Sequence, residues 1–156
     1  MYSHGWRRRA LAGLALVLAV AVTTGGCGGQ SLPQADDGAI RIGGVGPLSQ
    51  PGAVQVGNEM KWAMEQAVAD VNAAGGVLGK QLQLVFGDTQ NQPDVAASVA
   101  EKLVYEDGVV GVVGEYHSGA ALAQIPVYAK AGIPVVFAET WNDKITAGDP
   151  SDPNLP

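Results

Sequence analysis

The chain has 156 residues, of which 9 are basic and 15 acidic, and its formal net charge at pH 7 is −6. This length provides one globular core and excludes two domains of ordinary size. The acidic balance excludes a nucleic acid or an anionic membrane surface as the partner, because both bind to clustered positive charge.

The N-terminal segment, residues 1–26, predicts a signal peptide that does not belong to the core. Arg7, Arg8 and Arg9 precede an apolar run over residues 10–22, and a bilayer-spanning helix would need about 20 apolar residues. A basic start, a short apolar stretch and then small residues are typical of export signals. The arginine run leaves the export route, Sec or Tat, open. Removing this segment gives a mature net charge of (9 − 3) − 15 = −9.

Cys27 is the only cysteine in the sequence and follows the small residues "TTGG". A single exported cysteine has no internal disulfide partner. The stretch resembles a bacterial lipobox, in which the cysteine is lipidated and becomes the mature N-terminus, although Thr24 stands where lipoboxes usually carry an aliphatic residue. An ordinary cleavage site beside a free cysteine is the alternative. Residues 27–38 are rich in glycine and polar residues and predict a flexible tether.

Strand-like and helix-like patterns alternate from residue 39 onward. Residues 39–45 predict a short apolar strand, and apolar residues spaced by three and four then predict a helix. One face of this helix is formed by Val56, Met60, Met64, Ala67 and Val71. Gly75 and Gly76 are expected to end it, because glycine accepts the left-handed cap conformation. Residues 81–88 predict the second strand.

The second half of the predicted fold begins at Pro93, where a proline can start a helix because its missing N–H has no intrahelical partner. Gly108 ends this helix. Residues 109–114 are apolar without polar alternation, which predicts a parallel strand covered on both faces. A third helix follows to about residue 130, with a kink or a delayed start at Pro126. Residues 133–138 predict the fourth strand.

The βαβαβαβ order predicts an α/β fold, with a doubly wound parallel sheet and helices on both faces. The last residues, "TAGDPSDPNLP", contain no closing helix or strand. We therefore expect residues 39–156 to form an incomplete lobe at the front of a longer protein.

Motif spacing argues against three kinds of catalytic site. A nucleophile elbow needs glycine two residues on either side of its serine, but Tyr116 and Ala120 take those positions around Ser118. The segment "GVGPLS" lacks the third glycine of a dinucleotide fingerprint, and no P-loop lysine follows a glycine run. His117 is the only histidine beyond the predicted signal peptide. We therefore expect no catalytic residue, no metal, no cofactor and no enzymatic activity.

Polar loops remain at the expected carboxyl ends of the strands, where open α/β sheets bind ligands. Their sequences are "GPLSQPGA", "GDTQNQ", "GEYHSGA" and "ETWND". Ser118 stands at the start of the third helix, where its hydroxyl and the free N–H groups of the first turn can receive a carboxylate. A plain helix cap is the alternative role of this serine.

The string "AVADVNAAGGVLGKQLQL", together with the spacing from "GPLS" to "GEYHSGA" to "GIPVVFAETW", resembles the branched-chain-amino-acid-type substrate-binding proteins of ABC transporters. The resemblance covers residues 40–146 and matches the first lobe of their type I periplasmic-binding fold. It implies a two-lobed extracytoplasmic receptor that closes on an amino acid, an amide or a similar small polar solute. The implied partners are a membrane permease and its ATPase. A sensing receptor of the same fold that feeds a signalling protein stays open, as does a nucleotide-dependent enzyme, which the glycine spacing disfavours.

The resemblance implies seven ligand-binding residues: Ser49, Val56, Ser118, Gly119, Glu139, Thr140 and Trp141. Ser118 matches the serine that binds the ligand's carboxylate, and Val56 falls where the family often has an aromatic residue. Glu139 and Trp141 stand where the family usually has small or hydroxylated residues, which argues against a simple branched-chain amino acid. A carboxylate beside an indole suits an amine-bearing group.

The other polar residues of these loops are expected to have structural roles. Tyr116 and His117 are predicted to be wall or packing residues, and His117 replaces a residue that is cysteine in some relatives. Glu115 is predicted to be a solvated loop charge. Asp88 and Pro93 are predicted to be turn and helix-start residues without a role in ligand binding.

Overall fold

A computed structural model describes residues 38–147. Within this range the elements in chain order are β1 (Ile40–Gly46), α1 (Val54–Ala73), β2 (Leu82–Asp88), α2 (Pro93–Tyr105), β3 (Val112–Val113), α3 (Ser118–Ala131), β4 (Val135–Val136) and α4 (Lys144–Ala147). The predicted signal peptide and Cys27 lie outside the described residues, as does the predicted tether apart from Gly38.

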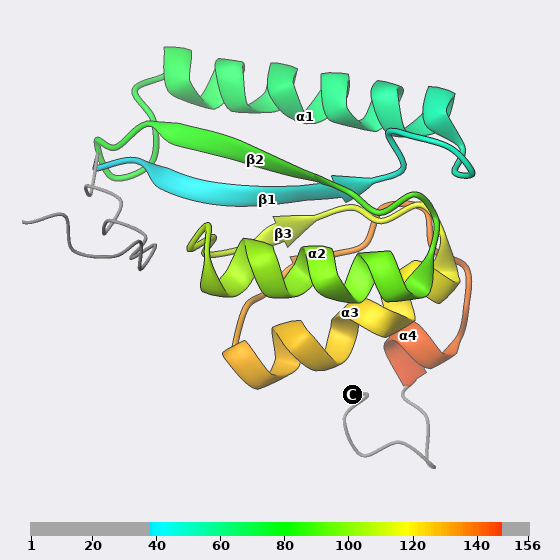
Figure 1. The fold of residues 1–156 in the computed structure, drawn as a ribbon. Coiled ribbons are helices and arrows are strands. Elements are labelled where there is room, and N and C mark those ends of the chain that lie inside the picture. Colours follow the sequence, from blue (N-terminus) through cyan, green and yellow to red (C-terminus); the bar gives the residue numbers. More distant parts are fainter. Residues whose placement is uncertain (1–37, 148–156) are drawn as a thin grey trace, which may run out of the picture. The chain divides into compact units, whose positions relative to one another are not determined.

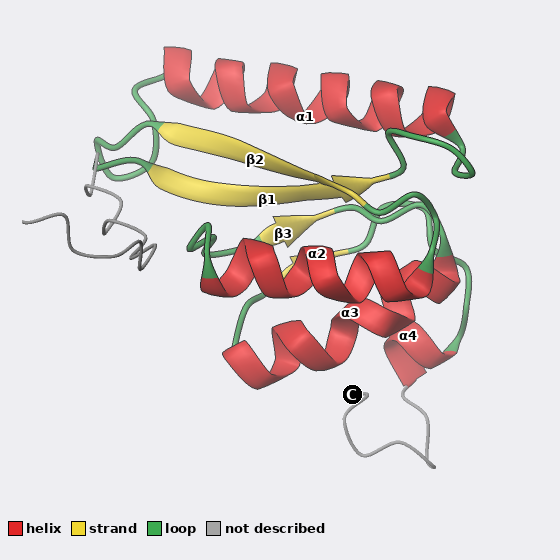
Figure 2. Cartoon of the chain, in the orientation of Figure 1, coloured by secondary structure: helices red, strands yellow, loops and turns green. Residues whose placement is uncertain are grey.

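The strands form one parallel sheet in the order β2–β1–β3–β4 (Figures 1 and 2). The β1–β2 pairing runs from Ile40 opposite Leu82 to Gly46 opposite Asp88. Consecutive strands therefore run in the same direction, and their carboxyl ends lie along one edge of the sheet. The predicted parallel α/β sheet is confirmed for the described residues.

Helices cover opposite faces of β1 (Figure 1). A Cβ atom added to Gly44 would lie 2.9 Å from Met64 Sδ of α1, and one added to Gly43 would lie 3.4 Å from Leu103 Cδ1 of α2. Successive residues of a strand point to opposite faces, so α1 and α2 pack on opposite sides of the sheet. The two glycines let both helices approach β1 closely.

The outer strands are covered less completely than the sequence predicts. Val113 and Val136 are in register with Gly44 and so belong to the α1 face. Since α1 packs on β1 and β2, Val136 remains 66% exposed. Val110, which precedes β3, is 54% exposed. The prediction that residues 109–114 are buried on both faces is therefore wrong for part of the run.

The predicted helix ends are confirmed. Gly75 and Gly76 follow α1 with φ angles of 104° and 76°, and Pro93 is the first residue of α2. α3 begins at Ser118 and continues through Pro126, so the proline does not delay its start.

The core lies between the sheet and α2 with α3. Its buried residues are Val45, Ala100, Leu103, Val109, Val112 and Tyr128. On the other side of the sheet, a Cβ atom added to Gly57 of α1 would collide with the carbonyl oxygen of Pro47. Glycine at this position is thus required for α1 to pack against the β1–α1 loop. None of the helices within residues 38–147 is long and apolar enough to cross a membrane.

Candidate functional site

A hollow of about 250 Å³ lies between the β3–α3 turn and the β4–α4 loop. The described residues that line it are Tyr116, His117, Ser118, Glu139 and Trp141. Both segments follow the carboxyl ends of neighbouring strands, where parallel α/β sheets bind ligands. The structure therefore brings together three of the seven predicted ligand residues, Ser118, Glu139 and Trp141, with two predicted wall residues.

Two hydrogen bonds join the two sides of this hollow. The backbone N–H of Glu139 donates to the carbonyl oxygen of Glu115 at 3.3 Å, and the backbone N–H of Trp141 donates to Ser118 Oγ at 3.1 Å. The Ser118 oxygen accepts the Trp141 N–H with one of its two lone pairs, so its proton and its second lone pair are left for a ligand. The Trp141 side chain does not pack on the sheet, since the residue is 89% exposed.

Glu115 is fully buried behind the hollow, so its prediction as a solvated loop charge is wrong. Its Oε1 accepts hydrogen bonds from the backbone N–H groups of Tyr116 at 2.8 Å and of His117 at 3.3 Å. Its Oε2 accepts one from the Gln124 side-chain amide at 3.1 Å. These donors replace water around the carboxylate, which explains how an acid can be buried here.

The Gln124 side chain continues this network into the core. The Tyr128 hydroxyl donates to Gln124 Oε1 at 2.8 Å, and both residues are buried. Burial, and then the nearby charge of Glu115, raise the pKa of Tyr128 above its ordinary value. The sequence held a signal for this network that was missed: Gln124 lies on the buried side of α3 with Ala121 and Ile125, and a polar residue at such a position requires a partner.

Asp88 connects the loops that follow β1 and β2. Ser49 Oγ donates to Asp88 Oδ2 at 2.6 Å, and the N–H groups of Leu48 and Gln90 donate to Asp88 Oδ1 at 2.7 and 3.1 Å. Burial alone would raise the pKa of Asp88, but these hydrogen bonds bring the pKa below its ordinary value. The bond to Gln90 confirms the turn role predicted for Asp88, and the contact with Ser49 was missed.

Four of the predicted ligand residues do not line the hollow. The Ser49 hydroxyl proton is donated to Asp88, so this serine can act towards a ligand only as an acceptor. Val56 is half-buried in the first turns of α1, and Gly119 is the second residue of α3. Thr140 is half-buried and stands between Glu139 and Trp141 in the sequence. Their part in ligand binding stays a prediction.

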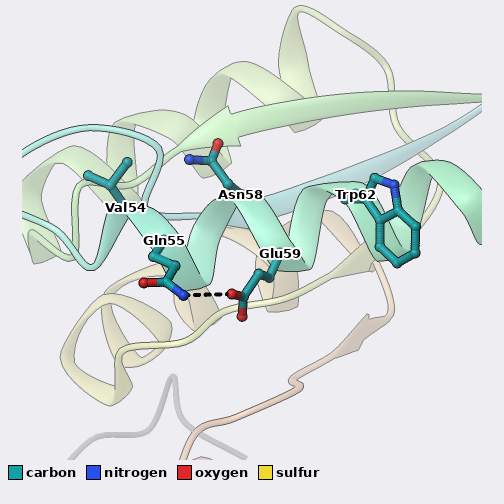
Figure 3. A pocket seen from close by; sticks show the side chains of 5 residues that line it. All are labelled: Val54, Gln55, Asn58, Glu59 and Trp62. Atoms are coloured by element: carbon teal, nitrogen blue, oxygen red, sulfur yellow. Dashed lines mark hydrogen bonds between the residues drawn. The ribbon is translucent and has the colours of Figure 1, made fainter.

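A second hollow, of about 510 Å³, lies on α1 (Figure 3). It is lined by Val54, Gln55, Asn58, Glu59 and Trp62. Figure 3 shows these side chains spread along the helix, with Gln55 donating to Glu59 at 3.0 Å. All of them belong to a single element, whereas the smaller hollow gathers polar groups from two loops at the strand ends. Because a ligand site needs convergent polar groups, the smaller hollow is the better candidate.

Neither hollow resembles a metal centre. Among residues 38–147 there is no group of three or more His, Cys, Asp or Glu side chains that could hold a metal ion.

Comparison with known proteins identifies relatives of this chain. A family model described as periplasmic binding protein matches residues 39–155. The Leu/Ile/Val-binding protein homolog 2 of Brucella abortus is 37% identical over 107 residues, which are 69% of this chain and 28% of that protein. The Leu/Ile/Val-binding protein of Escherichia coli K12 is 36% identical over 108 residues, which are 29% of its length. The chain thus spans less than a third of these relatives.

Solved structures of substrate-binding proteins also superpose on this chain. The branched-chain amino acid transporter substrate-binding protein LivJ from Streptococcus pneumoniae, in complex with isoleucine, superposes with a TM-score of 0.67 at 34% identity. The match covers 70% of this chain and 31% of that protein. A leucine-binding protein, LivK, from Thermotoga maritima superposes with a TM-score of 0.58 at 26% identity. These relatives are named for binding or transport, in agreement with the prediction that the chain is not an enzyme.

Proposed function

The chain belongs to the periplasmic binding protein family, and from that premise we propose that it forms the first lobe of an extracytoplasmic solute-binding protein of an ABC transporter. The ligand would be an amino acid or a related small polar solute such as an amide. The observation that carries the proposal is the hollow at the carboxyl ends of β3 and β4, lined by Ser118, Glu139 and Trp141.

The chemistry of this hollow suits a ligand with two different polar ends. The Ser118 hydroxyl has a proton to donate, and the N–H groups of the first turn of α3 point out of the helix start, where a carboxylate or amide oxygen is stabilised. Glu139 is exposed at the same hollow and can accept hydrogen bonds from an ammonium or amide group. Trp141 adds an aromatic face for the cationic end, at about 0.5–1 kcal/mol for an exposed contact.

We further propose that a second lobe completes the site. The chain spans 28% of the length of a Leu/Ile/Val-binding relative, which leaves room for a lobe on the other side of the ligand. Closure of two lobes would exclude water and supply the remaining contacts. The chain by itself should therefore bind the ligand far more weakly than a two-lobed protein does.

The proposed location is the extracytoplasmic side of the membrane, with Cys27 as the lipid anchor. The basic and apolar segment before Cys27 supports export, and the lipobox resemblance supports lipidation. A permease and an ATPase in the membrane would be the partners. The alternative, a sensing receptor for a signalling protein, would use the same ligand site and differ in this partner, so ligand uptake by cells that carry the intact gene distinguishes the two.

The ligand site can be tested on the chain itself by titrating the isotope-labelled protein with leucine and isoleucine and following backbone amide shifts. We expect the amides of Ser118, Gly119, Thr140 and Trp141 to shift progressively and to saturate at high ligand concentration. A sugar at the same concentrations is the negative control. Shifts that concentrate instead around Trp62 would assign binding to the α1 hollow and refute the proposed site.

A further inference from the structure

We propose that Glu115 determines the charge class of the ligand, because its buried carboxylate is bonded to the backbone of two residues that line the hollow and disfavours ligands with a net negative charge. This inference rests on the proposed function and adds a residue that does not itself line the hollow. It predicts a receptor for zwitterions, amines or amides, and not for simple carboxylic acids.

The hydrogen bonds of Glu115 indicate that its carboxyl group is ionised. Both of its oxygens accept: one from the N–H groups of Tyr116 and His117, the other from the amide of Gln124. A protonated carboxyl group would need an acceptor for its own proton, and the observed arrangement offers none, because Gln124 Oε1 already accepts from the Tyr128 hydroxyl. A protonated form would have to turn over the Gln124 amide and reverse the Tyr128 hydroxyl. All three donors are uncharged, so they solvate the carboxylate without neutralising it.

The position of this charge changes the usual preference of a helix start. The N-terminus of a helix carries the equivalent of about +0.5 elementary charge and attracts anions. Glu115 precedes α3 by three residues and brings a full negative charge to the same end, where it also occupies two backbone N–H groups. The sum at the start of α3 is therefore negative, and an anion gains less there than at a helix start without such an acid.

The hollow adds to the negative charge at the start of α3. Among the residues that the structure describes, its lining contains the carboxylate of Glu139 and neither lysine nor arginine, and the Glu139 N–H is bonded to the carbonyl oxygen of Glu115. The two acids thus lie on connected segments, one buried behind the hollow and one exposed at its rim. A ligand that brings a carboxylate alone would be repelled by both charges, whereas an ammonium group on the same ligand would be attracted by them.

The substitution Glu115→Gln removes the charge and conserves the shape. The glutamine carbonyl can keep the bonds from Tyr116 and His117. Its amide can donate to Gln124 if the Gln124 amide turns over, and the Tyr128 hydroxyl can then accept where it now donates. The whole network can reverse its direction, so every buried group keeps a partner and the variant is expected to fold.

The test uses three probes with the same branched hydrocarbon: leucine, isocaproate, which lacks the ammonium group, and isoamylamine, which lacks the carboxylate. Amide-shift titrations give the affinity of each for the unmodified chain, Glu115→Gln and the control Glu101→Gln, whose charge lies on the exposed side of α2. We expect Glu115→Gln to strengthen isocaproate binding and weaken isoamylamine binding by roughly three- to ten-fold each. Leucine should change by less than about two-fold, since its two charges are affected in opposite directions.

The outcomes separate the inference from the proposed function. A purely structural role of Glu115 would weaken all three probes together, and that result, like equal affinities in all three proteins, would overturn the inference while the binding site stood. If none of the probes shifts the amides of the hollow in the unmodified chain, the proposed function itself fails, and the inference with it.

Discussion

Asp88 offers the sharpest test of how the strand-end loops are held. Its carboxylate accepts three hydrogen bonds, two on Oδ1 from the N–H groups of Leu48 and Gln90 and one on Oδ2 from the Ser49 hydroxyl. In Asp88→Asn the amide oxygen can keep both N–H donors, and the amide nitrogen can donate to Ser49 Oγ instead. Asp88→Asn therefore loses only the negative charge. Asp88→Ala loses all three hydrogen bonds.

The expected losses of stability follow from this difference. Hydrogen bonds to a charged group contribute about 1.5–3 kcal/mol and neutral ones about 1 kcal/mol. The Asp88 carboxylate is only partly buried, so the losses fall below the sum of the full values. Asp88→Asn should lower the free energy of unfolding by about 2 kcal/mol and Asp88→Ala by about 4 kcal/mol. Urea unfolding measures both, and the exposed Glu101→Gln should stay within about 0.5 kcal/mol of the unmodified protein.

The pH dependence of the difference identifies the charge as its cause. The pKa of Asp88 lies below the ordinary value of 3.8 in the folded chain. A lowered carboxyl pKa contributes stability that is fully present above the unfolded pKa and is lost as the pH falls through the folded pKa. The gap in unfolding free energy between the unmodified protein and Asp88→Asn should therefore be constant from neutral pH to about pH 5 and shrink below about pH 4. A gap that does not change with pH would refute the reasoning.

Four further predictions follow from the site and the fold. Gly57→Ala places a methyl group against the carbonyl oxygen of the β1–α1 loop and should lower the unfolding free energy by about 3 kcal/mol in urea unfolding, despite the better helix propensity of alanine; an unchanged midpoint would contradict the close packing. Ser118→Ala removes the acceptor for the Trp141 N–H and the donor to the ligand, so leucine affinity in amide-shift titrations should fall by about ten-fold; unchanged affinity would limit this serine to holding the β4–α4 loop. Glu139→Gln should weaken isoamylamine more than isocaproate, and equal effects in the same titrations would exclude an ammonium contact. Cys27→Ser should abolish acylation of the exported protein, detected by mass spectrometry of its N-terminal peptide and by detergent partitioning; an unmodified cysteine on the membrane-bound parent protein would refute lipidation.

The elements that the sequence predicted well are those whose signals are local. The helix ends at Gly75 and at Pro93 depend on the backbone preferences of single residues, and both were predicted correctly. The exposure of Val110 and Val136 was not predictable in the same way. For Val136 it depends on how far α1 extends across the sheet, and an apolar run contains no information about the helix that will cover it.

In the candidate site, too, the residues with local signals could be predicted, and the residue whose environment depends on a distant side chain could not. Ser118 and Trp141 could be assigned to the strand ends, because the carboxyl ends of neighbouring parallel strands always meet at one edge. Glu115 could not be assigned from its own position, since an acid in a glycine-containing loop is usually solvated. Its burial depends on Gln124, nine residues further along the chain, whose amide replaces water at the carboxylate.

The two networks around the hollow together restrict what a ligand can present to it. Because one lone pair of the Ser118 oxygen accepts the Trp141 N–H, the hydroxyl keeps its proton to donate, so a hydrogen-bond acceptor on the ligand suits this position. Because Glu115 leaves the start of α3 with a net negative sign, that acceptor is bound best when the ligand as a whole carries no negative charge. An amide oxygen meets both conditions directly. A carboxylate meets them only when an ammonium group on the same molecule reaches Glu139, which is the arrangement that an α-amino acid provides.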